Sequence, residues 1–110
     1  GQLFEQFVGL EIIRQGRFCE QRTRLYFWKD LNGPEVDWVI SRKGNFIPIE
    51  TKWHERPKVA DARHLELFLD EYPNSQKGFV ICRTPRPFTL TKRVTALPWQ
   101  NIKELLENHL

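Results

Sequence analysis

Cysteine is scarce in this sequence, and cysteine motifs that bind metals are missing. The 110 residues contain two cysteines, Cys19 and Cys82, with no CxxC pair and no Cys/His cluster at zinc spacing. A structural zinc site is therefore not expected. No secretory segment accompanies the two thiols, so we expect reduced cysteines in a cytoplasmic protein rather than a disulfide.

Long apolar runs and a phosphate loop are also missing. The longest runs, such as FVIC at 79–82, are far too short to cross a bilayer. The sequence has no Gly-x-x-x-x-Gly-Lys-Ser/Thr motif, so any ATP hydrolysis would belong to another segment. We therefore expect neither a membrane span nor a nucleotide-hydrolysing site in these residues.

Charge of one sign is only slightly in excess, with 17 basic and 14 acidic side chains giving a net charge of +3. This balance permits a polyanionic partner without requiring one. Aromatic residues make up 13% of the chain, which argues against disorder. The length is enough for one core, so we expect a single domain over residues 1–110.

Hydrophobic periodicity and turn residues predict the order of the elements. Six residues share one broad face of the first helix: Leu3, Phe4, Phe7, Val8, Leu10 and Ile12. Residues 83–98 contain three prolines and are expected to be an irregular strand or a loop. The expected elements are helices over 3–14, 60–72 and 101–109 and strands over 24–29, 35–41, 46–53 and 78–82.

These elements predict a mixed sheet. Three consecutive strands joined by short turns form an antiparallel meander, and the helical return to the fourth strand makes a parallel, right-handed crossover. We therefore expect an α/β (α+β) fold with a mixed four-stranded sheet flanked by helices. Its core order is α-β-β-β-α-β, followed by a C-terminal helix.

Acidic residues interrupt the second and third strands. Asp37 lies in an otherwise apolar run, and Glu50 and Lys52 are two residues apart, so they share one face of a strand. A two-residue turn at 43–44 places Asp37 directly opposite Glu50, with Cβ atoms roughly 4.5–5.5 Å apart. A three-residue turn without a bulge would instead place Asp37 opposite Thr51.

Two carboxylates at this distance repel each other unless a cation lies between them. Mg²⁺ prefers oxygen ligands and is commonly bound by one or two carboxylates together with water and substrate phosphates. Asp37 and Glu50 therefore predict a Mg²⁺ (or Mn²⁺) site, with the backbone carbonyl of Thr51 as a further ligand. Lys52 could position or deprotonate the attacking water and stabilise charge on a phosphate.

The order Asp37, twelve residues, Glu50-Thr51-Lys52 resembles the D…E-x-K signature of the PD-(D/E)XK nuclease superfamily. The element order is similar to that superfamily's core, which is of restriction-endonuclease-like type. The resemblance implies phosphodiester hydrolysis, with DNA the favoured substrate and Asp37, Glu50 and Lys52 catalytic. It also implies a carboxylate from the first helix, for which Glu5 is the first choice and Glu11 the second.

A second resemblance spans nearly the whole chain. It rests on GQLFEQFV at 1–8, LYFW at 25–28, GPEVDWVI at 33–40 and PIETK at 48–52. These segments are similar to the nuclease-like C-terminal domain that follows many prokaryotic AAA-type ATPase modules. The resemblance implies that the chain is a C-terminal fragment whose partner is an ATPase module in the same full-length protein.

Nucleic acid is the expected partner, and two basic groups are candidates for contacting its phosphates. The four tryptophans are expected to serve as core or edge packing, and His54 is expected on the surface. Alternative interpretations are a catalytically silent module that binds nucleic acid or a protein for the ATPase, and a scaffold that dimerises through aromatic residues. The basic groups are Arg83, Arg86, Lys92 and Arg93, with Phe88 among them, and Arg14, Arg17, Arg22 and Arg24; the tryptophans are Trp28, Trp38, Trp53 and Trp99.

Overall fold

Each helix and strand expected from the sequence has a counterpart in the computed structural model, which describes residues 1–17, 24–28, 35–42 and 44–108. The turn expected after the first strand, at 32–33, lies outside these ranges, as do Cys19 and Arg22. The elements are α1 (Gln2–Gly16), β1 (Arg24–Trp28), β2 (Val36–Arg42), β3 (Asn45–Thr51), η1 (Val59–Ala62), α2 (Arg63–Glu71), β4 (Gly78–Cys82), β5 (Phe88–Thr89), β6 (Val94–Pro98), η2 (Trp99–Asn101) and α3 (Ile102–Asn108).

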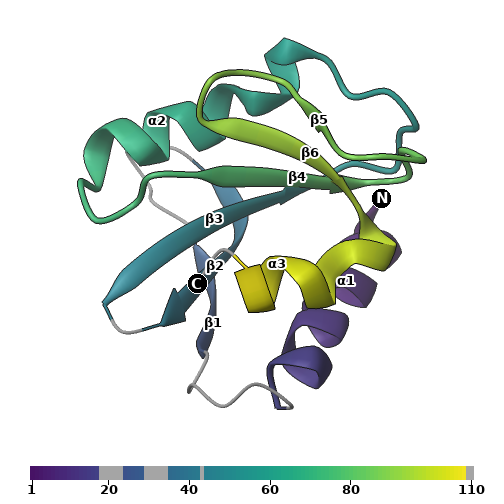
Figure 1. The fold of residues 1–110 in the computed structure, drawn as a ribbon, viewed down its shortest axis with the longest axis horizontal. Helices are drawn as coiled ribbons and strands as arrows, with labels where there is room; N and C mark the ends of the chain where they lie inside the picture. Colours follow the sequence, from purple (N-terminus) through teal and green to yellow (C-terminus); the bar gives the residue numbers. More distant parts are fainter. Residues whose placement is uncertain (18–23, 29–34, 43, 109–110) are drawn as a thin grey trace.

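The sheet is mixed, with the strand order β1-β2-β3-β4-β6-β5 (Figure 1). The first three strands pair antiparallel, as the meander predicted. β4 then joins β3 in parallel after the α2 crossover, β6 joins β4 in parallel, and β5 closes the edge antiparallel to β6. The chain therefore forms an α+β fold in which β3 has an antiparallel neighbour on one side and a parallel one on the other.

The predicted strand count of four was wrong, because the described residues form six strands. The two additional strands lie within residues 83–98, for which the prolines left an irregular strand or a loop as alternatives. β6 holds its proline at the last position, Pro98, where a missing N–H disturbs the pairing least. β5 has two residues, which is too short for an alternating pattern to show in the sequence.

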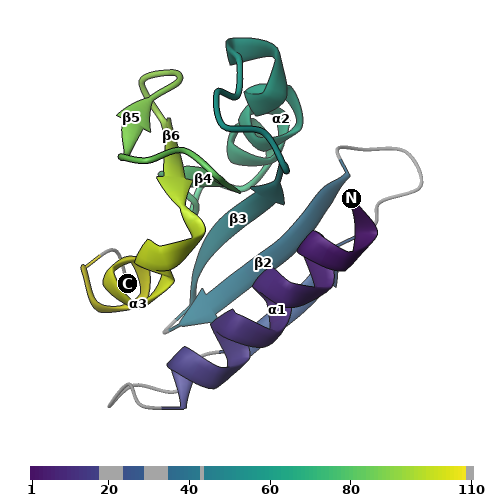
Figure 2. The same cartoon turned by 90° about the vertical axis from the view of Figure 1, so that its right-hand side faces the viewer.

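Helices cover both faces of the sheet (Figure 2). One core cluster joins α1 and α3 to the sheet and is centred on residues such as Val8, Phe79 and Leu105. The other cluster joins α2 to the opposite face through Leu65, Phe68 and neighbours. β4 is buried along its whole length, which confirms the interpretation of its continuous apolar run as a strand covered on both faces.

The buried face of α1 is narrower than the sequence predicted. Phe4, Val8 and Ile12 are buried, whereas Leu3 is 83% exposed and Leu10 is 67% exposed. Residues four apart form a single row along a helix, and these three side chains pack into the core. Leu3 and Leu10 belong to the broad apolar face expected from the sequence but remain exposed.

Gly9 allows α1 to approach β2 closely. A Cβ atom at this position would lie 2.5 Å from Cζ2 of Trp38. The same indole donates a hydrogen bond from Nε1 to the backbone oxygen of Glu5, at 3.2 Å. The contact between helix and strand therefore fixes the first turn of α1 against the sheet.

No helix in the described ranges is long and apolar enough to cross a membrane. The last helix, α3, begins at Ile102, one residue later than expected. Asn101, directly before this helix, ends the short helix η2. Its Nδ2 atom donates to Oε2 of Glu104 at 3.4 Å.

Candidate functional site

The register between β2 and β3 is the one predicted from a two-residue turn. Arg42 pairs with Asn45, and the pairing continues without a shift to Trp38 and Ile49. Gly44 lies in the turn with a φ angle of +78°, a conformation that glycine adopts without strain. One step further along the same register, Asp37 lies opposite Glu50.

Asp37 is fixed by the end of β3. Its Oδ2 atom accepts one hydrogen bond from the backbone N–H of Thr51 and another from the Thr51 hydroxyl, both at 2.8 Å. Backbone pairing of the two strands ends at Trp38 and Ile49, so the carboxylate of Asp37 satisfies the next β3 amide that faces β2. The predicted carbonyl contribution of Thr51 to a metal remains a prediction.

Glu50 is almost entirely buried, with 9% of its surface exposed. Its pKa is raised from 4.5 to about 9, first by burial and then by the hydrogen bond with Asp37 and the negative charge of that residue. Glu5 raises the pKa further, and Lys52 opposes the shift. At neutral pH, therefore, Glu50 is protonated and shares its proton with Asp37.

Five of the predicted site residues meet at one cavity of about 300 Å³. Glu5 from α1 lines it, but Glu11 is not among its lining residues. Glu11 instead accepts two hydrogen bonds from the guanidinium of Arg14, at 3.0 and 3.1 Å. The structure therefore favours Glu5, the first choice, as the helix carboxylate. The cavity is lined by Gly1, Glu5, Asp37, Glu50, Thr51, Lys52, Trp53 and His54.

Lys52 lies just beyond the end of β3 but continues its direction, because its N–H donates to the Ile81 carbonyl at 3.0 Å. Its side chain is partly buried and lines the cavity. Within the described ranges, its ammonium group makes no ion pair within 4 Å. A positive charge next to two carboxyl groups is therefore available to a bound anion.

The donor set suits a hard cation bound by few protein ligands. No group of three Asp, Glu, His or Cys side chains in the described part of the chain is arranged to hold a metal ion. Asp37 and Glu50 interact with each other as a pair, and Glu5 lines the same cavity. Two carboxylates, completed by water and substrate oxygens, are typical of Mg²⁺ sites.

Trp53 and His54 also line this cavity, and His54 is exposed, as expected. Trp53 is 53% exposed and contacts the ring of Phe4, so of the two expected roles, core or edge packing, it has that of edge packing. Trp38 and Trp99 do pack against the core, and the side chain of Trp28 lies outside the described part. The signal that could have identified Trp53 was its place directly after Lys52.

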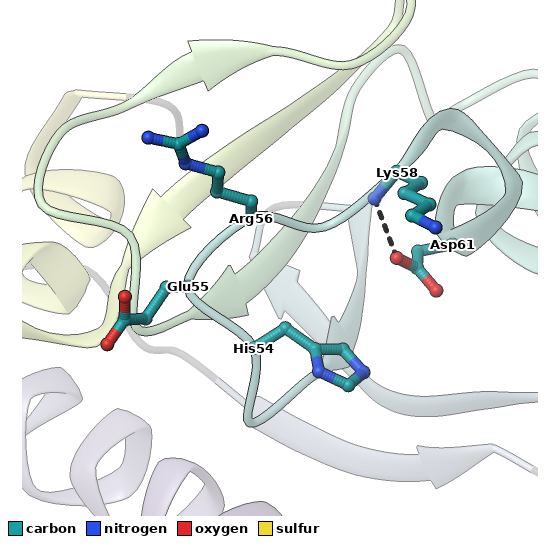
Figure 3. A pocket seen from close by; sticks show the side chains of 5 residues that line it. All are labelled: His54, Glu55, Arg56, Lys58 and Asp61. Carbon is teal, nitrogen blue, oxygen red and sulfur yellow. Dashed lines mark hydrogen bonds between the residues drawn. The ribbon is translucent and has the colours of Figure 1, made fainter.

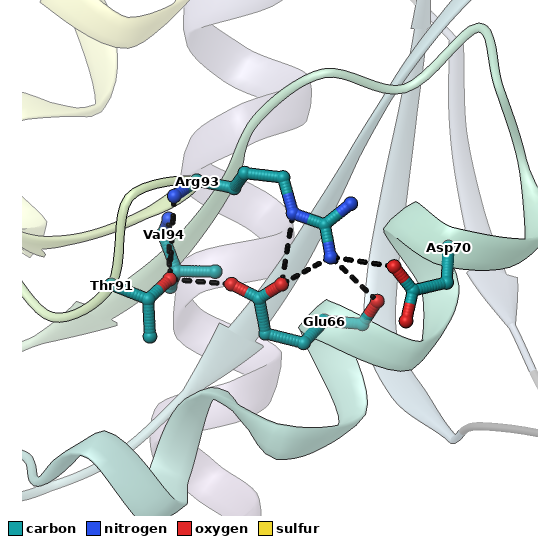
Figure 4. A network of polar contacts seen from close by, with 5 residues as sticks. All are labelled: Glu66, Asp70, Thr91, Arg93 and Val94. Carbon is teal, nitrogen blue, oxygen red and sulfur yellow. Dashed lines mark hydrogen bonds and ion pairs between the residues drawn. The ribbon is translucent and has the colours of Figure 1, made fainter.

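The basic residues predicted to contact phosphates differ in their contacts and in their exposure. Arg93 donates to Glu66 and to Asp70 (2.7 Å), and Thr91 donates to the same Glu66 carboxylate (Figure 4). Arg93 therefore joins the turn before β6 to α2. Arg83 lies against Trp53, with its Cζ atom 4.3 Å from the ring centroid. Arg17, Arg86 and Lys92 are exposed, Arg14 is paired with Glu11, and only the backbone of Arg24 is described.

A second cavity, of about 620 Å³, lies beside the first, and His54 lines both. It is formed by the loop between β3 and η1, where the backbone N–H of Lys58 donates to Oδ2 of Asp61 at 2.7 Å (Figure 3). Nothing in the sequence pattern indicated this cavity. Its lining residues are His54, Glu55, Arg56, Lys58 and Asp61.

Comparison with known protein families identifies the family of this chain. The chain belongs to the family described as a domain of unknown function, DUF4143, whose model matches residues 1–102. No curated protein and no solved structure matches it significantly. The family description names no activity, so the chemistry has to be argued from the cavity.

Proposed function

We propose that this domain is a Mg²⁺- or Mn²⁺-dependent nuclease that hydrolyses phosphodiester bonds, with DNA as the favoured substrate. The observation that carries the proposal is the single cavity that contains Asp37, Glu50, Thr51, Lys52 and Glu5. The PD-(D/E)XK resemblance supports the proposal, since Asp37 lies on β2 and Glu50 on β3. The second resemblance, to the C-terminal domain that follows AAA-type ATPase modules, supports attachment to such a module in a longer chain.

Asp37 and Glu50 would hold the cation, with the Thr51 carbonyl as a further oxygen ligand. Burial, followed by the hydrogen bond with Asp37 and its negative charge, raises the pKa of Glu50 to about 9, so a neutralising charge would favour ionisation of Glu50. Bound there, the cation would supply Lewis-acid stabilisation of charge on the phosphate and a lowered pKa for water. Glu5 adds negative charge at the side of the cavity that α1 forms.

The other groups of the cavity have separate tasks in this proposal. The Lys52 ammonium, which has no ion pair with a described residue, would bind a non-bridging phosphate oxygen and position the attacking water. Thr51 would keep the Asp37 carboxylate in place through its two hydrogen bonds. Orientation of this kind contributes to catalysis because the groups need not reorganise during the reaction.

A cleavage assay combined with a metal titration tests this proposal. Fluorescein-labelled single-stranded and duplex DNA would be incubated with the protein and 5 mM Mn²⁺ or Mg²⁺, on the order of a concentration that saturates a weak two-carboxylate site. We expect product from the wild type and about 10²-fold or greater loss in Asp37→Asn and Lys52→Met. Lys77→Gln removes one positive charge at the opposite end of β4 from Arg83 and is the matched control.

Electron paramagnetic resonance of Mn²⁺ separates binding from turnover. We expect wild type to bind Mn²⁺ and Asp37→Asn to bind it at least about tenfold more weakly. Product formation that survives both Asp37→Asn and Lys52→Met would overturn the assignment of these residues. Strand binding without Mn²⁺ binding or cleavage would instead support the catalytically silent module.

A further inference from the structure

Trp53 is an exposed aromatic side chain at the mouth of the carboxylate cavity. It follows Lys52 directly, lines the same cavity as Asp37 and Glu50, and leaves about half of its surface in contact with solvent. Exposing an indole forgoes the stabilisation that its burial would give. Such a side chain beside a cluster of charged groups is typical of a surface that stacks on a ligand.

The indole is held in one orientation by contacts from two other segments. The ring of Phe4 meets it edge-on, with centroids 4.9 Å apart, and the guanidinium of Arg83 lies over its face. Arg83 is itself held in place at two points. Its backbone N–H donates to the His54 carbonyl at 2.9 Å, and its side-chain Nη2 atom lies 3.7 Å from Oε1 of Glu55. The stacked pair is thus formed before any ligand arrives.

The second cavity, next to the Trp53–Arg83 pair, is lined by two further positively charged side chains. The side chains of Arg56 and Lys58 form no hydrogen bond or ion pair with any residue that the structure describes. The two acids of this cavity have partners, since Glu55 faces Arg83 and Asp61 accepts the Lys58 N–H. Figure 3 shows the side chains of the loop residues projecting on both sides of its backbone, with Asp61 of η1 next to Lys58.

We propose that Trp53 and Arg83 form a stacking platform for an unpaired base of single-stranded DNA. The base would extend the existing stack of indole and guanidinium, and the cations of the second cavity would bind a phosphate further along the strand. The inference rests on the proposed function, in which the phosphodiester bond lies at Asp37 and Glu50. Bases inside a duplex are stacked on each other, so the platform selects single strands or locally unpaired ends.

Binding in EDTA tests the platform without any cleavage. Fluorescence anisotropy with fluorescein-labelled oligo(dT) would give Kd for wild type, Trp53→Ala and Arg83→Gln at one fixed salt concentration. We expect each substitution to weaken binding about tenfold. Lys77→Gln removes the same charge from the other end of β4 and should change Kd by less than about twofold.

Tryptophan fluorescence gives a readout that a merely structural role would not change. Among the tryptophans whose side chains are described, Trp53 alone is exposed. Unlabelled oligo(dT) should therefore quench the tryptophan fluorescence of wild type and leave that of Trp53→Phe almost unchanged. Circular dichroism checks the folding of Trp53→Ala, because the contact with Phe4 is lost. Arg83→Gln alters an exposed side chain and keeps the test valid if Trp53→Ala unfolds.

Two results would overturn the platform. One is a duplex of the same length bound as tightly as oligo(dT), and the other is Trp53→Ala and Arg83→Gln both binding like Lys77→Gln. Failure of hydrolysis is a different result: strand binding that depends on Trp53, without product in Mn²⁺, supports the platform and refutes the nuclease. Cleavage at equal rates in wild type, Trp53→Ala and Arg83→Gln supports the nuclease and refutes the platform.

Discussion

Asp37 and Glu50 face each other across the β2–β3 pair, where burial, and then the hydrogen bond with Asp37 and its charge, raises the pKa of Glu50 to about 9. Two hydrogen bonds from Thr51 hold Asp37 in place on its other side. At neutral pH Glu50 is therefore uncharged. A divalent cation would have to displace the shared proton, so pH and cation binding are coupled.

The first prediction concerns stability without metal. The pKa of Glu50 is higher in the folded than in the unfolded state, so its stabilising contribution is complete below about pH 4.5 and is lost as pH rises towards 9. Glu50→Gln keeps a neutral side chain at every pH. We expect its free energy of unfolding to exceed that of wild type increasingly from pH 5 to pH 9, by at most about 1.4 kcal/mol per pH unit.

Urea unfolding in EDTA at several pH values measures this difference. Glu71→Gln, at an exposed position of α2, is the matched control and should follow wild type throughout. A constant difference between Glu50→Gln and wild type across the range would show that Glu50 does not retain its proton in the fold.

The second prediction concerns proton release. Because Glu50 is protonated at pH 7, binding of Mn²⁺ by both carboxylates should release about one proton, and the affinity should rise with pH. Calorimetric titrations in two buffers with different ionisation enthalpies would measure the number of protons. Glu50→Gln has no proton to lose at this position, so its heat of binding should not depend on the buffer. Equal buffer dependence in both proteins would contradict the assignment.

The third prediction concerns the contact between α1 and β2. Gly9→Ala places a methyl group against the Trp38 ring, which is also held by its hydrogen bond to the Glu5 carbonyl. Alanine favours a helix by about 1 kcal/mol over glycine, but we expect the clash to dominate, with a net loss of about 1–3 kcal/mol. Gly1→Ala, whose new Cβ meets nothing within 4 Å, should lie within about 0.5 kcal/mol of wild type. Thermal unfolding compares the two, and equal stability would contradict the close packing.

The fourth prediction separates a structural arginine from a binding one. Arg93 already contacts Glu66 and Asp70, so Arg93→Gln should lower the free energy of unfolding by about 1 kcal/mol. The Kd for oligo(dT) should stay near that of wild type. Arg83→Gln should show the opposite pattern, with binding weakened and stability nearly unchanged. A weakened Kd in Arg93→Gln would restore the original interpretation of this residue as a phosphate contact.

The core of the candidate site could be predicted because it depends on local rules. A two-residue turn at 43–44 determines the pairing of β2 with β3, and the alternation of a strand then brings Asp37 and Glu50 together. The strand at 78–82 was equally clear, since only burial on both faces explains an uninterrupted apolar run.

The rest depends on contacts that the local pattern does not contain. The helical wheel shows that Leu3 and Leu10 are apolar, but only tertiary packing determines that Phe4, Val8 and Ile12 make the contact with the sheet. The pairing of β6 with β4 is likewise long-range. The exposure of Trp53 follows from where β3 ends, and element boundaries are the least certain part of any prediction from sequence.

The cavity lies where distant parts of the chain meet. Glu5 belongs to the first turn of α1, Asp37 to the start of β2 and Glu50 to the end of β3. Bringing these segments together requires the closure of long loops, whose entropic cost is repaid only when the sheet is complete. A ligand that needs all three residues would bind the native chain and not a partly folded one. Its concentration would then shift the balance between folded and unfolded molecules by mass action.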